Sequence, residues 1–355
     1  RKDLNFVKYI LNTMLHAGEW IMSNLIEVYK LSKHFPVSAG LFSRKKKYVY
    51  AMDEISFTLG EKETLGLVGE SGCGKSTASR TILNLITPTS GQVWFQGQNL
   101  FTLKPYEKRK LRQGIQIIFQ DPFGSLNPRL TVKRIVEEPL LTHKIGDRAS
   151  RRQEVEKMLT KVGLLPEHMK RFPHEFSGGQ RQRIMLARAL ILKPKLIIAD
   201  EPVSALDVSV QAQMLNLLKR LQEEMDLSYI FISHDLGVIR HVSHKVAVMY
   251  LGEIVEIAPV DPLYNEPLHP YTISLLSSVP VPDPKKKNRT RKILQGDVPS
   301  PRNPPAGCRF HTRCPDCMDI CTREKPDTRQ VKKNHMVACH LYQDGELWVP
   351  PLPNQ

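Results

Sequence analysis

The stretch GESGCGKST, residues 69–77, constrains the fold of this chain more than any other part of its sequence. Three glycines in nine residues suit neither a strand nor a helix, because glycine loses the most backbone entropy in regular structure. The apolar run ETLGLV comes before this stretch and the helix-like run KSTASRTILNLI begins within it. The spacing G-x-x-x-x-G-K-S between a strand and a helix predicts a phosphate-binding loop in an α/β fold.

Each part of this loop has an expected role. The glycines let successive backbone amides point at anionic oxygens, and the positive end of the helix dipole adds to the attraction. We expect Lys75 to reach the β- and γ-phosphates of ATP and Ser76 to bind Mg²⁺. A glycine-rich turn with a solvated lysine is the alternative. The predicted nucleotide contacts here are Gly69, Ser71, Gly72, Gly74, Lys75, Ser76 and Thr77.

Two carboxylates follow a short apolar run far downstream. LIIADE ends in Asp200 and Glu201. Carboxylates at the end of a buried strand are costly unless something compensates their charge. Beside a phosphate loop, we expect Asp200 to contact Mg²⁺, directly or through water. Glu201 is then expected to be the general base that polarises the attacking water. An acidic pair that caps a helix is the alternative.

Two further polar residues follow apolar strands. His234 comes after YIFIS and is expected to contact the γ-phosphate and hold Glu201 and the water in place. Gln120 comes after IQIIF and is expected to lie near Mg²⁺ and that water. Each residue alone is uninformative, and only the neighbouring motifs favour a catalytic role. The expected catalytic residues are Glu201, His234, Lys75 and Gln120, and the expected Mg²⁺ ligands are Ser76, Gln120 and Asp200.

A second glycine-rich helix start, FSGGQRQR, occupies residues 176–183. A serine, two glycines and the free amides of a helix start form a second anion site. One nucleotide cannot easily use two such cradles on one subunit. We therefore expect this one to close over a nucleotide that another subunit holds. Its predicted contacts are Ser177, Gly178, Gly179 and Gln180.

These motifs and their order resemble the ATP-binding cassette (ABC) family over about residues 22–257. The resemblance implies that two cassettes enclose two ATP molecules head to tail, each between one subunit's phosphate loop and the other's signature serine. It implies a P-loop NTPase (RecA-like) α/β core with a β-subdomain and a helical insert. An aromatic residue near the N-terminus usually stacks on adenine; Phe35 is expected here, with Tyr48 and Tyr50 as alternatives. Four motifs are assigned by it: the Q-loop Gln120, the signature 177–180, the D-loop Asp207 in SALD, and the switch His234.

Composition changes near residue 259, where proline becomes dense and five of the six cysteines follow between Cys308 and Cys339. A loop-rich segment with few apolar residues needs a cross-link or a metal to fold. We call residues 259–355 the tail. The predicted domains are an N-terminal extension (1–21), an ABC ATP-binding domain (22–258) with its helical insert at about 121–192, and the Pro/Cys-rich tail.

The cysteine spacing in the tail favours a metal group. The gaps between Cys308, Cys314, Cys321 and Cys339 are five, six and seventeen residues. Zinc sites favour two short C-x₂₋₄-C pairs, and only Cys314–Cys317 fits one. The longer gaps suit a larger group, a 4Fe-4S cluster, with Cys317 spare. Zn²⁺ and free or oxidised thiols are the alternatives.

Four strings resemble the ATPase subunits of oligopeptide and dipeptide importers: FQDPFGSLNPR, ADEPVSALDVSVQAQ, HPYTISLLSSVP and the tail string GDVPSPRNPPAGCRFHTRC. The resemblance implies an ATP hydrolase that powers peptide import, peripheral on the cytoplasmic face of the cell membrane. The implied partners are a second ABC ATPase subunit (hetero- or homodimer), two membrane permease subunits and an extracytoplasmic peptide-binding protein. Nickel and glutathione importers have similar tails, so the cargo stays open.

The net charge of +15 favours acidic partners such as nucleotides or an anionic membrane face. We expect no nucleic acid partner, because the chain lacks a cluster of stacking aromatics or a known reader fold. A soluble ABC ATPase acting on nucleic acid or ribosomes remains a second hypothesis. A plain kinase does not explain the signature helix. The sequence contains no run of about 18 apolar residues, so we predict no membrane span.

Overall fold

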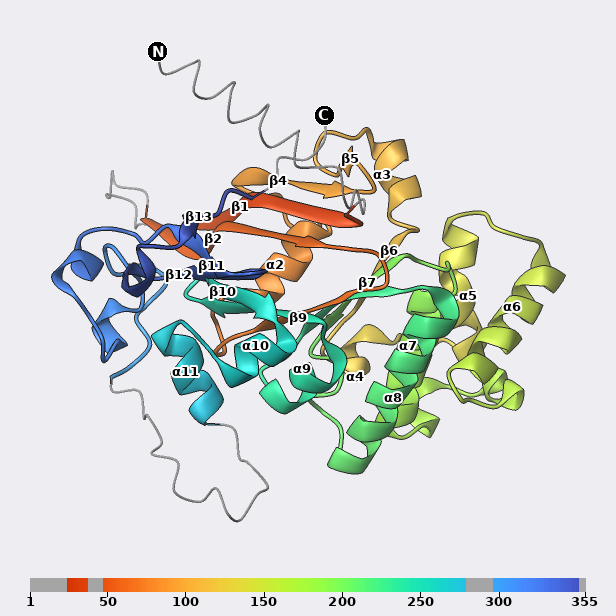
Figure 1. Ribbon diagram of the computed structural model, residues 1–355. Helices are drawn as coiled ribbons and strands as arrows, with labels where there is room; N and C mark the ends of the chain where they lie inside the picture. Colours follow the sequence, from red (N-terminus) through yellow and green to blue (C-terminus); the bar gives the residue numbers. More distant parts are fainter. Residues whose placement is uncertain (1–23, 38–46, 279–295, 351–355) are drawn as a thin grey trace.

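The structure is a computed structural model that describes residues 24–37, 47–278 and 296–350. Within these ranges the chain forms a large mixed sheet flanked by helices, a smaller antiparallel sheet next to it, and a helical region at one side of the molecule (Figure 1). The predicted N-terminal extension at 1–21 lies outside the described residues. The predicted α/β fold is confirmed.

The large sheet has a parallel half built from buried apolar strands. Its order is β9 (Lys245–Tyr250), β3 (Thr64–Val68), β8 (Ser228–Ile232), β7 (Leu196–Asp200) and β6 (Ile115–Ile118). Every residue of β3, β7 and β8 is buried, as expected for parallel strands covered on both faces. The carboxyl ends of these strands therefore meet along one side of the sheet, where the predicted motifs follow them.

Helices follow the parallel strands and cover the sheet. α2 (Lys75–Ile82) follows β3, α8 (Val208–Met225) follows β7, and α9 (Leu236–Val242) follows β8. The connection from β6 to β7 is long and largely helical, as predicted for the insert. It contains α4 (Pro122–Ser125), α5 (Val132–Thr142), α6 (Arg148–Lys161) and α7 (Gly178–Leu190), and α7 packs on α5 and α6.

The smaller sheet is antiparallel and lies over the first part of the core. Within the described ranges its order is β2 (Lys47–Leu59), β1 (Ile26–Val37), β4 (Ser90–Phe95) and β5 (Gln98–Asn99), followed by α3 (Pro105–Leu111). Ile26 of β1 lies opposite both Leu59 and Phe95, which fixes the register of three strands. These side chains form one core with apolar residues of β3 and α2. The phosphate loop is thereby attached to both sheets.

The tail joins the large sheet. β9 and β10 (Glu253–Pro259) form an antiparallel hairpin, and this hairpin is not the last part of the sheet. After α10 (Val260–Asn265) and α11 (Pro270–Ser277), β12 (His335–Ala338) pairs with β10, and β11 (Thr328–Lys332) and β13 (Glu346–Leu347) follow outward (Figure 1). The sheet thus continues across the predicted boundary at 258/259. That division into domains remains a prediction.

Within the described part of the chain, we find no helix that combines the length and the hydropathy needed to cross a bilayer.

Candidate functional site

A cavity of about 500 Å³ lies at the carboxyl ends of the parallel strands. In an open α/β sheet this is where ligands bind, because the loops that leave the strands diverge there. The phosphate loop, between β3 and α2, forms one wall. The residues after β6, β7 and β8 face it, and β2 and the tail add the rest. The lining residues are Val49, Ala51, Ser71, Gly72, Gly74, Lys75, Ser76, Thr77, Gln120, Glu201, His234 and Pro301.

The phosphate loop has the backbone that its glycines predict. Gly74 has a φ of 109°, and a Cβ there would lie 2.1 Å from the carbonyl oxygen of Ala51. Lys75 is 5% exposed, and its Nζ donates hydrogen bonds to the carbonyl oxygens of Gly69 at 2.7 Å and Glu70 at 2.9 Å. The ammonium group of Lys75 is thus held at the base of the loop, at the N-terminus of α2.

Two oxygen groups beside the loop suit Mg²⁺. Ser76 Oγ donates to Asp200 Oδ1 at 3.1 Å, and Asp200 is 3% exposed. Burial raises the pKa of Asp200; the hydrogen bond from Ser76 opposes this, and the charge of Glu201 adds to it. A hydroxyl and a buried carboxylate are the hard oxygen ligands that Mg²⁺ prefers. The two side chains therefore fit the predicted ion, and their role as its ligands remains a prediction.

Glu201 is held between two of the predicted catalytic side chains. Gln120 Nε2 donates to Glu201 Oε2 at 2.8 Å, and His234 Nδ1 lies 3.1 Å from Glu201 Oε1. Glu201 itself has a left-handed backbone, with a φ of 49°, directly after β7. The structure thus brings Lys75, Gln120, Glu201 and His234 to one cavity from four separate loops. Their catalytic roles remain predictions.

The signature motif lies elsewhere on the molecule. Ser177 is the exposed N-cap of α7: its Oγ accepts from Gln180 N at 3.4 Å, and Gln180 Oε1 accepts from Ser177 N at 3.1 Å. Gly178 and Gly179 form the first turn. Asp207 is likewise exposed at the start of α8. Among the described residues that line the nucleotide cavity, none belongs to this motif, as the prediction of a site shared between subunits requires.

The aromatic residue predicted to stack on adenine lies outside the described lining of the cavity. Phe35 lies on β1 opposite Val49, and Lys33 Nζ lies 4.9 Å from the centroid of its ring. Neither Phe35 nor the two alternative tyrosines is among the described residues that line the cavity. Phe35 therefore stays a prediction. Val49, Ala51 and Pro301, which do line the cavity, were missed because small apolar residues carry no local sequence signal for binding.

The cysteines of the tail gather at one place. Cys308 N donates to the carbonyl oxygen of Cys321 at 2.9 Å. The pKa of Cys308 is raised to about 12, mainly by burial and further by the nearby thiols of Cys339, Cys321 and Cys314, against the opposing effect of a hydrogen bond from the Phe310 backbone. Cys317 is exposed. Each cysteine of the chain is free, and the described residues hold no group of three or more His, Cys, Asp or Glu side chains set to bind one metal ion.

Two tail-side contacts on the phosphate loop were not expected from the sequence. Tyr271 Oη accepts a hydrogen bond from Glu70 N at 2.9 Å, and the Arg313 guanidinium contacts the carboxylate of Glu70. Both residues occur in the strings that resemble peptide importers, HPYTISLLSSVP and CRFHTRC. No spacing rule links either of them to a loop more than 200 positions away in the sequence.

Two family models match this chain. One, "ABC transporter", matches residues 52–204, and the other, "Oligopeptide/dipeptide transporter, C-terminal region", matches residues 255–321. The second match spans the predicted domain boundary and reaches Cys308, Cys314 and Cys321.

Curated relatives and solved structures agree with these matches. The oligopeptide transport ATP-binding protein AppF of Bacillus subtilis is 54% identical over 320 residues, which are 90% of this chain and 97% of that protein. The oligopeptide transport ATP-binding protein OppF of Escherichia coli is 53% identical over 319 residues, 89% of this chain and 95% of that protein.

A dimeric ATP-binding cassette, MJ0796, solved in a post-hydrolysis state with ADP and phosphate, superposes with a TM-score of 0.58 at 29% identity. That match covers 66% of this chain and 98% of the cassette. The cassette cbiO1 of Clostridium perfringens gives a TM-score of 0.59 at 25% identity, over 68% of this chain and 91% of that one. The chain is an ATP hydrolase of the ABC transporter family, and it belongs to the branch of that family defined by the oligopeptide/dipeptide transporter C-terminal region.

Proposed function

We propose that this chain is the ATP-hydrolysing subunit that powers the import of di- or oligopeptides through a membrane permease, from the cytoplasmic face of the cell membrane. The cargo is suggested by the relatives that are named oligopeptide transport proteins. The observation that carries the ATPase part is the cavity in which Lys75, Glu201 and His234 meet. Peptide, rather than nickel or glutathione, is the cargo we propose.

The residues around the cavity divide the work of hydrolysis. Lys75 and the loop amides bind the β- and γ-phosphates and orient the terminal one for attack. Glu201 takes the proton of the attacking water, while Gln120 and His234 each hold one of its two carboxylate oxygens. Ser76 and Asp200 would hold Mg²⁺, which neutralises charge that develops on the phosphate oxygens when bound.

A second ATPase subunit completes the pocket. Ser177 is exposed, and neither it nor the first turn of α7 is among the described residues that line this chain's own cavity, so we expect the γ-phosphate they would bind to belong to the partner. The partner is a related ATPase subunit or a second copy of this chain. Two permease subunits and an extracytoplasmic peptide-binding protein complete the proposed assembly.

The tail thiols are proposed to hold a 4Fe-4S cluster, with Cys308, Cys314, Cys321 and Cys339 as ligands. The proximity of the four thiols supports a shared group. Zn²⁺ is the alternative. The role of the metal group would be to stabilise the fold of a tail that has few apolar residues of its own.

One experiment tests the cargo and the base together. The chain is purified with its permeases, placed in lipid vesicles, and assayed for ATP hydrolysis with binding protein loaded with peptide, nickel or glutathione. We expect peptide-loaded protein alone to raise turnover, and Glu201→Gln to abolish it while ATP stays bound. Stimulation by nickel or glutathione instead would overturn the proposed cargo. Unchanged turnover in Glu201→Gln would remove Glu201 as the base.

Iron and acid-labile sulfide analysis of anaerobically purified protein tests the cluster. We expect about four iron atoms per chain, lost in Cys308→Ser and kept in the matched control Cys317→Ser. Stoichiometric zinc without sulfide would contradict the cluster.

A further inference from the structure

We propose that Arg313, in the cysteine-rich tail, is a positioning residue for ATP binding: it fixes Glu70, and through Glu70 the phosphate loop and Lys75. The site of action is the short run CRFHTRC, residues 308–314, which we call the arginine loop. Nothing in its sequence resembles a nucleotide-binding motif. Its contacts nevertheless reach the loop that binds the phosphates.

The contact between Arg313 and Glu70 is bidentate. Arg313 Nη1 lies 2.9 Å from Glu70 Oε2, and Nη2 lies 3.2 Å from Oε1. The Arg313 side chain is 7% exposed and that of Glu70 is 27% exposed, so the pair is shielded from most of the solvent. Two parallel charged hydrogen bonds fix the orientation of both groups, which a single contact between flexible side chains does not.

Glu70 is held at three points that lead to Lys75. Its carboxylate is held by Arg313, its backbone N–H donates to Tyr271 Oη at 2.9 Å, and its carbonyl oxygen accepts from Lys75 Nζ at 2.9 Å. Tyr271 is fully buried in α11. A shift of Glu70 therefore moves the carbonyl oxygen that holds the ammonium group of Lys75. The position of the phosphate-binding lysine thus depends on a residue that never touches the nucleotide cavity.

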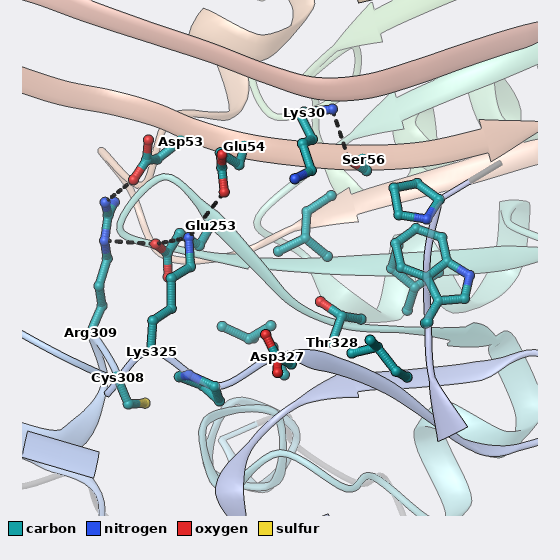
Figure 2. A pocket seen from close by; sticks show the side chains of 18 of the residues that line it. Lys30, Asp53, Glu54, Ser56, Glu253, Cys308, Arg309, Lys325, Asp327 and Thr328 are labelled. Atoms are coloured by element: carbon teal, nitrogen blue, oxygen red, sulfur yellow. Dashed lines mark hydrogen bonds and ion pairs between the residues drawn. The ribbon is translucent and has the colours of Figure 1, made fainter. Parts of the chain in front are cut away.

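The arginine loop is fixed to the cassette at a second point (Figure 2). Arg309, 8% exposed, pairs with Asp53 of β2 and, through Nε at 3.0 Å, with Glu253 of β10. It also donates to the carbonyl oxygen of Leu251. Arg309, Asp53 and Glu253 line a second cavity of about 340 Å³ between the tail and the two sheets. With Arg309 anchored, Arg313 is presented to Glu70 from a fixed base.

The arginine loop is closed by cysteines. Arg309 and Arg313 lie between Cys308 and Cys314, and Cys308 N is bonded to the carbonyl oxygen of Cys321. If these thiols share a group, as proposed above, its loss frees the arginine loop and weakens ATP binding by the same route. That extension rests on the proposed cluster, whereas the role of Arg313 does not.

The test uses the full-length chain and four variants. Arg313→Gln and Glu70→Gln each remove the pair from one side, and the double variant removes both partners. Arg329→Gln is the matched control: Arg329 is also in the tail and half-buried, but its guanidinium bonds to Gly345 O within the tail. The measurements are the dissociation constant of a non-hydrolysable ATP analogue with Mg²⁺, amide hydrogen exchange over residues 69–76, and KM and kcat for ATP in the assembled transporter.

We expect Arg313→Gln and Glu70→Gln each to weaken analogue binding about tenfold, with faster exchange in the phosphate loop, and Arg329→Gln to leave both unchanged. KM should rise more than kcat falls, because the loop is displaced and the base is not. The double variant should bind no worse than either single variant, because each single substitution already removes the same Arg313–Glu70 interaction. Binding as tight as wild type in a folded Arg313→Gln protein overturns the proposal. So do additive losses in the double variant.

Two further outcomes keep the test decisive. Should Arg313→Gln not fold, Glu70→Gln carries the test alone, and wild-type affinity in that variant refutes the positioning role. Cys308→Ser is measured beside them. Weakened binding in that variant, with no further loss on adding Arg313→Gln, supports the link to the cluster. If Cys308→Ser binds the analogue as tightly as wild type, and the wild-type protein holds no iron, the cluster proposal fails while the role of Arg313 stands.

Discussion

The buried carboxylate of Glu256 should be the strongest single link between the tail and the cassette. It is 1% exposed on β10 and accepts from Leu268 N at 2.8 Å, from His269 N at 2.9 Å and from His335 Nε2 at 2.7 Å. These donors come from the start of α11 and from β12. Glu256→Ala would leave three buried donors without an acceptor, at about 1–3 kcal/mol each. Removal of the buried charge itself offsets part of this cost, so the net loss should be about 3–5 kcal/mol.

The assay is urea unfolding followed by circular dichroism, with limited proteolysis of the tail. A loss of this size is a large share of the about 5–15 kcal/mol that holds a typical domain folded. Glu266→Gln is the control, since Glu266 also pairs with the β11–β12 hairpin, through Lys332, but on the surface. We expect a lower urea midpoint and early cleavage of the tail in Glu256→Ala, and little change in the control. Equal midpoints in the two variants would show that the buried contacts do not hold the tail.

Three other perturbations test the site and its support. Glu201→Gln should lower ATP turnover by about 10²–10⁴-fold with the nucleotide still bound, measured by phosphate release; a smaller loss would argue against a general base. Gly74→Ala should abolish ATP binding, because its Cβ would lie 2.1 Å from Ala51 O; normal binding in a titration would contradict that geometry. Burial lowers the pKa of His269 to about 4 from about 6.5 when unfolded, so the unfolded chain binds the extra proton between these values. Stability should therefore fall by up to about 3 kcal/mol as pH drops from about 6.5 to 4. His269→Asn, which keeps an acceptor for Tyr271 N, should flatten this slope of urea midpoint against pH, and an unchanged slope would rule out His269 as its source.

Much of the cassette could be predicted because its signals are local. The phosphate loop depends on a fixed spacing between a strand and a helix, and the other three predicted catalytic residues lie within two positions of the end of an apolar strand. Since the carboxyl ends of parallel strands meet, Gln120, Glu201 and His234 had to converge once those strands were recognised. The capping pair of Ser177 and Gln180 is equally local, since the two residues are three positions apart.

The tail could not be placed in this way, because its contacts join distant positions. Arg313 and Glu70 are 243 residues apart, and His335 and Glu256 are 79 apart. Composition distinguished the tail from the cassette. It could not predict the pairing of β12 with β10, because proline and cysteine content carries no information about which strands lie side by side in the fold. The same applies to Pro301, whose carbonyl oxygen accepts from Tyr50 N beside the nucleotide cavity.

The pairing of β12 with β10 also determines where the molecule can be cut. A fragment that stops after Pro259 would leave the outer backbone groups of β10 unpaired, next to the apolar side chains of Val255 and Ile257. Such an exposed strand is a template for aggregation. In the intact chain the sheet terminates instead at β13, a strand of two residues, which offers little for another molecule to pair with. We therefore expect a chain trimmed of its tail to aggregate during purification, and the intact chain not to.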